Sequence, residues 1–211
     1  MKFKIVSLFV LCAILISCGT SRQGGKKQRK GTKAQVVLTP EQQRKYDYFF
    51  LEASRLKMKD DYSAAFDLLQ HCLTINPNAS SALYEISQYY MYLKQVPQGQ
   101  AALEKAVEND PDNYWYSQGL ASLYQQQNEM QKATNLLESM ATRFSDRSDP
   151  LYSLLDIYNR LEEYDIVTTT LNRLEEKMGK NEQLSMEKFR IYLQKKDNQS
   201  AFREIESLVE E

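Results

Sequence analysis

The apolar positions of this chain follow a pattern that returns every 34 residues. The segment YSAAFDLLQHCLTINP, residues 62–77, returns as VPQGQAALEKAVENDP, residues 96–111, and both segments end in proline. In the later copies a large residue precedes a small one by three positions, and apolar residues follow four and seven positions further on. Apolar residues spaced three and four apart form one stripe of a helix, whereas a half-buried strand requires strict alternation. The pattern therefore predicts one amphipathic helix in each copy.

The pattern occurs five times. The stretch before each copy predicts another helix, which has its own apolar stripe and comes first in the pair. Leu83, Ile86 and Tyr90 form this stripe in the second copy. Ser87 belongs to the same stretch and is expected to face Gly99 of the following helix. Because small side chains let two helix backbones approach closely, each pair of helices can bury the larger residues around the contact.

A 34-residue period of helix pairs, with this order of large and small residues, resembles the tetratricopeptide repeat (TPR). The resemblance implies an all-α fold, a TPR α-solenoid in which antiparallel helix pairs form a right-handed superhelix. In the fourth copy Leu155, Val167 and Leu174 stand where small residues are usual, so we expect its helices to lie further apart. We expect the array to span residues 41–211, with repeats at about 46–79, 80–113, 114–147, 148–181 and 182–211.

The N-terminus predicts a targeting signal at residues 1–17. Lys2 and Lys4 precede an apolar run at residues 5–14, which is too short for a typical membrane span. The run ends in Leu-Ile-Ser-Cys, which resembles the lipobox of bacterial lipoproteins and implies cleavage before Cys18 and acylation of this residue. An ordinary secretory signal with a chance cysteine is the alternative. Three acyl chains would hold the protein on a membrane lastingly, since a single chain gives only marginal binding.

Residues 18–40 form the predicted lipidated tether, which is basic and too poor in apolar residues to fold. The chain has 27 Lys and Arg residues and 28 Asp and Glu residues, and eight of the cations precede residue 37. Because 27 minus 8 leaves 19 cations against 28 acids, the rest of the chain has a charge of about −9. Such an acidic array disfavours nucleic acid as a partner, and the tether is interpreted as a solvated spacer near anionic head groups.

The sequence offers little catalytic chemistry. The one histidine, His71, precedes Cys72, but neighbours on a helix point about 100° apart and do not form a nucleophile and base pair. Cys72 occupies a small core position of its helix and is interpreted as buried. The acidic pairs at 60–61, 162–163 and 175–176 are interpreted as solvated. We therefore expect no enzymatic activity, no cofactor and no metal site.

The surface is the remaining source of function. In TPR superhelices the first helix of each pair lines the concave face, and the resemblance implies which positions point into it. Tyrosine, tryptophan and arginine are frequent anchors of interfaces, and amides can bond a peptide backbone. Lysine and asparagine clamps that bind carboxylates are absent from the first two copies. The predicted groove residues are Tyr84, Gln88, Tyr92, Trp115, Gln118, Ser122, Gln125, Tyr152, Asp156, Asn159, Arg160 and Arg190.

The sequence-based hypothesis is a membrane-anchored TPR scaffold lipoprotein that binds a protein partner through this groove. Its expected location is the envelope of a Gram-negative bacterium, on the outer membrane and facing the periplasm, since Gly19 rather than aspartate follows Cys18. The alternatives are a module that binds peptidoglycan or polysaccharide, and a subunit of a secretion or outer-membrane assembly complex. Residues 201–211 complete the second helix of the fifth copy, and no further helix with a polar face follows to cover its apolar side, so we also expect further repeats or a partner there.

Overall fold

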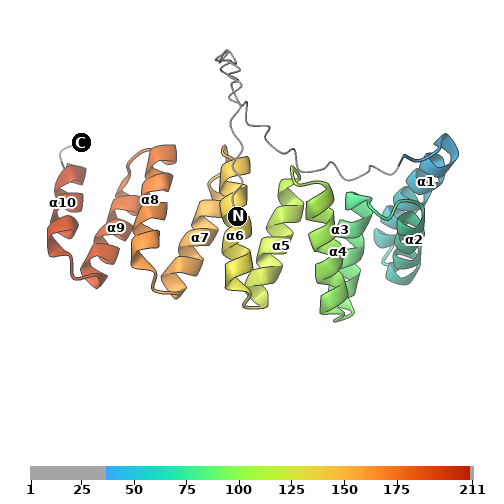
Figure 1. Cartoon of the computed structure of the whole chain (residues 1–211), viewed down its shortest axis with the longest axis horizontal. Helices are drawn as coiled ribbons and strands as arrows, with labels where there is room; N and C mark the ends of the chain where they lie inside the picture. The colour runs from blue at the N-terminus through green and yellow to red at the C-terminus, as the bar shows by residue number, and fades with distance from the viewer. Residues whose placement is uncertain (1–36, 210–211) are drawn as a thin grey trace, which may run out of the picture. The chain divides into compact units, whose positions relative to one another are not determined.

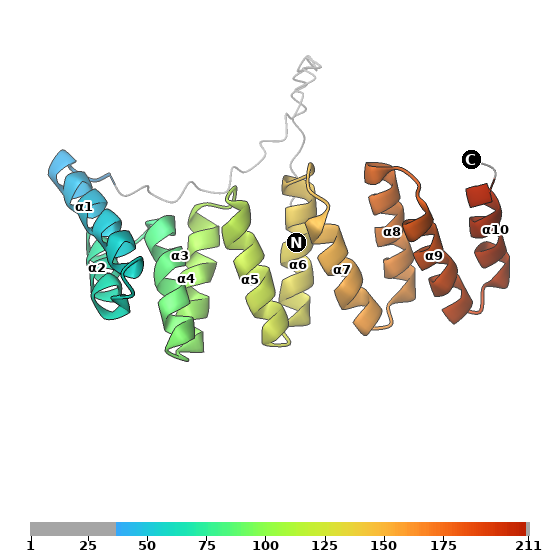
Figure 2. The ribbon, with the colours of Figure 1, turned by 180° about the vertical axis from the view of Figure 1, so that it is seen from behind.

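The computed structural model describes residues 37–209, and all of the described secondary structure is helical. The predicted signal peptide, Cys18 and most of the predicted tether lie outside these residues. The first helices of the pairs are α1 (Pro40–Lys57), α3 (Ser80–Tyr92), α5 (Tyr114–Gln126), α7 (Asp149–Arg160) and α9 (Glu182–Gln194). The second helices are α2 (Tyr62–Ile75), α4 (Val96–Asn109), α6 (Met130–Arg143), α8 (Tyr164–Met178) and α10 (Asn198–Val209). Each helix lies beside the next one in the chain (Figure 1; Figure 2 shows the opposite side).

The turn inside each helix pair repeats with the same 34-residue interval. One residue in each turn has a positive φ, between 57° and 61°, and none of the five is glycine: Asp60, Lys94, Asn128, Glu162 and Lys196. The next backbone N–H reaches back to a carbonyl of the preceding helix, as Gln95 does to Tyr90 at 2.8 Å. This is the 6→1 bond of a Schellman motif, which ends a helix and reverses the chain. The repeated turn sets the register of the second helices.

The helix ends are set by capping side chains and by glycine. Thr39 caps α1 in a capping box with Gln42, and Pro40 occupies the first helical position. The Asp61 side chain accepts the N–H of Ala64 at the start of α2. Gly179 ends α8 with a φ of 82°, a conformation that glycine adopts without steric cost. The short turns follow from these local signals.

Small residues bring the helices of a pair together. A Cβ atom added to Gly99 would lie 2.7 Å from Met91 Sδ and 3.2 Å from the carbonyl oxygen of Ser87. Only glycine therefore fits at this contact between α3 and α4 without displacing Met91. In the fourth pair the larger residues Leu155, Val167 and Leu174 are buried instead. The backbones of α7 and α8 are in close contact at fewer positions than those of α3 and α4. This confirms the expectation for the fourth copy.

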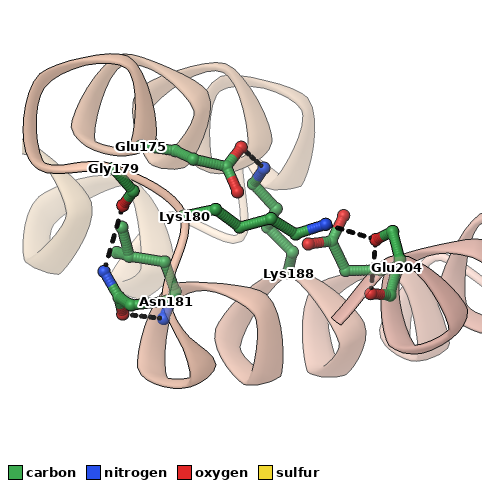
Figure 3. Close-up of polar contacts among 8 residues, drawn as sticks. Glu175, Gly179, Lys180, Asn181, Lys188 and Glu204 are labelled. Atoms are coloured by element: carbon green, nitrogen blue, oxygen red, sulfur yellow. Dashed lines mark hydrogen bonds and ion pairs between the residues drawn. The ribbon is translucent and has the colours of Figure 1, made fainter. Parts of the chain in front are cut away.

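A buried ion pair joins the fourth and fifth repeats. The Lys188 ammonium on α9 bonds the Glu175 carboxylate on α8, and their side chains are 5% and 22% exposed (Figure 3). The interpretation of Glu175 as a solvated surface residue is therefore wrong. The oxygens Glu175 Oε1, Ser185 Oγ and Glu204 Oε1 are also buried and have no hydrogen-bond partner. The core of this junction therefore contains charged and hydroxyl groups as well as apolar side chains.

Candidate functional site

Four aromatic side chains from α1, α3 and α5 meet in one pocket, which we call the aromatic pocket: Phe50, Tyr84, Trp115 and Tyr116, with Glu85 beside them. The cavity has a volume of about 380 Å³, and Ser81 and Asn113 complete its lining. The rings of Tyr84 and Tyr116 stack with centroids 4.8 Å apart, although the two residues lie in successive repeats. The pocket thus depends on the stacking of three repeats.

Trp115 remains exposed at this pocket, with 61% of its surface accessible. Its neighbour Tyr114 is buried, and the Tyr114 hydroxyl donates to Asp149 at 3.3 Å. The guanidinium of Arg147 lies 3.9 Å from the Tyr114 ring centroid and 5.6 Å from that of Trp115, while its Nε bonds Asp149 at 3.0 Å. The indole therefore has Arg147 over its ring but leaves most of its surface to solvent.

A second cavity lies on the other side of an ion pair between α1 and α3. We call it the tyrosine pocket: Lys57, Tyr62, Gln88, Tyr89 and Tyr92, with a volume of about 280 Å³. Lys57 Nζ bonds Glu85 Oε2 at 2.8 Å, so this ion pair joins a lining residue of each pocket.

The Tyr89 hydroxyl is the one unusual polar group of the tyrosine pocket. Its oxygen is buried and has no hydrogen-bond partner. Burial is the main cause that raises the pKa of Tyr89, and the nearby Lys57 ammonium acts in the opposite direction. Most of the accessible lining of this pocket is apolar, which suits an apolar side chain.

The structure places the predicted groove residues in separate groups. Tyr84 and Trp115 meet at the aromatic pocket, and Gln88 and Tyr92 meet at the tyrosine pocket. Further along, the Tyr152 hydroxyl contacts Met178 Sδ at 3.3 Å.

The other predicted groove residues lie on later helices or away from the two pockets. Gln118, Ser122 and Gln125 are on α5, and Asn159 is on α7. Asp156 bonds Arg160 within α7, with 3.5 Å between the two charged groups, and Arg190 bonds Glu187 within α9. The two pockets therefore involve only four of the predicted residues.

Sequence reasoning missed several lining residues. Tyr116 and Glu85 occupy repeat positions that the resemblance does not assign to the concave face, and Tyr62 begins a second helix. The local excess of aromatics in Tyr114-Trp115-Tyr116 was the available signal. Its geometry could not be predicted, because the contact with Tyr84 depends on how two repeats pack.

The titratable groups near the predicted core offer little reactivity. Cys72 is fully buried, and burial raises the pKa of its thiol to about 11. This confirms its interpretation as a core residue. Among residues 37–209 no group of His, Cys, Asp or Glu is arranged to hold a metal ion. In the same range, no helix combines the length and the apolar character needed to cross a membrane.

The fold and the pockets define a class: the chain has the TPR fold, an all-α solenoid of helix pairs. The crystal structure of MamA aligns with a TM-score of 0.60 and 17% identity, over 80% of this chain and 92% of that one. MamA from Desulfovibrio magneticus RS-1 gives 0.55 and 13%, over 79% and 94%. YrrB, described as a TPR protein with an unusual peptide-binding site, gives 0.58 and 12%, over 81% and 88%. No protein-family model and no curated protein sequence matches the chain.

Proposed function

We propose that this protein is a non-catalytic, membrane-anchored scaffold that binds protein partners through the first helices of its repeats. The main support is the aromatic pocket, where Trp115 is 61% exposed beside Tyr84 and Tyr116. Large aromatic residues bury much area at little entropic cost, and they are frequent anchors of protein interfaces. The peptide-binding site attributed to YrrB, which has a similar fold, is consistent with this use of the array.

Binding is tested best with two groove variants and one matched control. Trp115→Ala and Tyr152→Ala each remove a predicted anchor, whereas Tyr48→Ala removes a ring of α1, 64% accessible, that is not among the predicted groove residues. Crosslinking and co-purification of the whole chain from detergent extracts should lose partners in the first two variants only. Identical partner sets in all three variants would refute the groove assignment.

The membrane anchor is part of the same proposal and rests on the sequence alone. The lipobox at residues 15–18 supports acylation of Cys18, and the expected location is the outer membrane of a Gram-negative envelope, facing the periplasm. Mass spectrometry of the mature N-terminus should find an acylated cysteine. Cys18→Ser should move the protein from the membrane fraction to the soluble fraction, and a variant that stays on the membrane would contradict the anchor.

A glycan is the second candidate ligand, because an exposed indole such as that of Trp115 can stack on a sugar ring. Trp115 is the one tryptophan of the chain, so its fluorescence reports on the aromatic pocket directly. Titration with soluble peptidoglycan fragments should change this fluorescence if glycan is the ligand. A response to peptides and none to the fragments favours the protein partner. A fixed stoichiometry in purified complexes would instead indicate a subunit of an assembly.

A further inference from the structure

The charge of the aromatic pocket is as informative as its rings. Glu85 is the one charged residue among those that line the pocket. Its carboxylate is 28% exposed and bonds Lys57 through Oε2, and Lys57 itself lines the tyrosine pocket rather than this one. Four rings and one carboxylate therefore face the space, and the one formal charge on its lining is negative and is paired with Lys57 through Oε2.

A second carboxylate, that of Asp110, acts on Tyr116 without lining the pocket. Burial is the largest cause that raises the pKa of Tyr116, and the charges of Asp110 and Glu85 raise it further. Both carboxylates therefore favour a positive charge near the Tyr116 hydroxyl, and the Lys57 ammonium that pairs with Glu85 offsets part of this effect. The whole array is also negative, since residues 37–211 contain 19 cations and 28 acids. A partner with a positive charge is therefore attracted as it approaches and stabilised once it is bound.

Aromatic faces attract cations because the ring quadrupole is negative above the ring. The surface next to the pocket already contains such a contact, since the Arg147 guanidinium lies 3.9 Å from the Tyr114 centroid. The exposed indole of Trp115 provides a further face at the pocket, and the carboxylate of Glu85 provides the matching charge.

We propose that the aromatic pocket binds a lysine or arginine side chain of the protein partner, held between the rings of Tyr84, Trp115 and Tyr116 and the Glu85 carboxylate. This inference rests on the proposed function, because it names the chemistry of the partner at the same surface. The chain's preference is thus opposite to that of a carboxylate clamp, which requires cations in the groove.

The tyrosine pocket provides a second contact for the same bound peptide. Its α3 residues lie about one to two helical turns beyond those of the aromatic pocket, which places the two cavities about 10 Å apart at 1.5 Å per residue. An extended peptide covers this distance in about three residues. The tyrosine pocket is lined mainly by apolar surface, so a bulky apolar residue follows or precedes the basic residue by about three positions.

The test is a selection of random linear peptides displayed on phage against the whole chain in detergent. Three proteins are compared: the wild type, Glu85→Gln, and the control Glu138→Gln, which removes a carboxylate that pairs with Arg173 on α8. The wild type and the control should enrich peptides with a lysine or arginine at one fixed position. Glu85→Gln should lose this preference while its far-UV circular dichroism stays unchanged.

The selected peptide gives a second measurement that does not depend on how a variant folds. Replacing its arginine by citrulline, a neutral side chain of similar shape, should weaken binding about tenfold or more in a Trp115 fluorescence titration. Enriched peptides without a basic residue, or equal affinity for citrulline, would overturn the inference and leave protein binding in place. If no enriched peptide changes Trp115 fluorescence, the groove itself is wrongly assigned and both proposals fail.

Discussion

The ion pair between Lys188 and Glu175 predicts an asymmetric response to mutation. Glu175→Ala leaves an ammonium group whose side chain is 5% exposed without its partner, which should cost about 3–5 kcal/mol. Lys188→Leu leaves Glu175, which is 22% exposed and can turn toward water, so its cost should be smaller, about 1–3 kcal/mol. The double variant should be close to the wild type, because no uncompensated charge remains.

The sequence itself supplies the design of the double variant. At the 34-residue interval, Lys188 corresponds to Leu154 and Glu175 corresponds to Ala141, at the junction of the third and fourth repeats. Leu154 is fully buried, so a leucine is accommodated at that repeat position. The Glu175→Ala, Lys188→Leu variant thus copies an apolar junction already present in the chain. Replacing a buried ion pair by apolar residues is often neutral or stabilising by about 1–4 kcal/mol.

Urea unfolding followed by far-UV circular dichroism gives the four free energies of the double-mutant cycle. We expect a coupling energy of about 4–8 kcal/mol, because the two single effects sum to about that value and the double variant is close to the wild type. Because repeats unfold partly independently, Trp115 fluorescence should report little change in the third repeat, while hydrogen exchange of α9 and α10 amides should accelerate in Glu175→Ala. Glu138→Ala, which breaks the more exposed pair with Arg173, should cost less than about 1 kcal/mol. Additive single effects, with coupling below about 0.5 kcal/mol, would refute the reasoning.

Three further predictions concern stability and reactivity. Gly99→Ala should destabilise the folded chain by about 1–3 kcal/mol in urea unfolding, because the new Cβ meets Met91. Gly119→Ala, whose Cβ would lie 3.5 Å from its nearest neighbour, should stabilise the folded chain by up to about 1 kcal/mol. The reverse order of the two free energies would contradict this account. Lys94→Gly should stabilise by about 0.5–1 kcal/mol because φ is 57°, and Lys94→Ala, which keeps a Cβ, should give no gain. Peptide mapping after alkylation at pH 9 should show Cys72 protected until the chain unfolds, since its pKa of about 11 exceeds the ordinary value of 9.0. The unfolded chain releases that proton first, so its contribution to stability should fall as pH rises from about 9 to 11; rapid labelling of the folded protein would refute burial.

Sequence reasoning succeeded where local spacing determines the structure. The helix pairs and the core position of Cys72 were both predicted, and the cap at Thr39 and the end of α8 at Gly179 are equally local features. Each depends on residues within about one or two turns, because helical periodicity and capping bonds are local. The same reasoning was wrong for Glu175, because the charge pattern of its own helix does not reveal that Lys188 lies opposite.

The amino-acid sequence by itself determined the fold class of this protein: its 34-residue spacing of large and small side chains specifies helices, their pairing and their turns. Only the tertiary structure decided which side chains form the aromatic pocket. Tyr84 and Tyr116 lie in different repeats, and their stacking depends on the angle and the offset at which α3 and α5 are held. Those quantities arise from packing summed over several helices, and no local spacing encodes them.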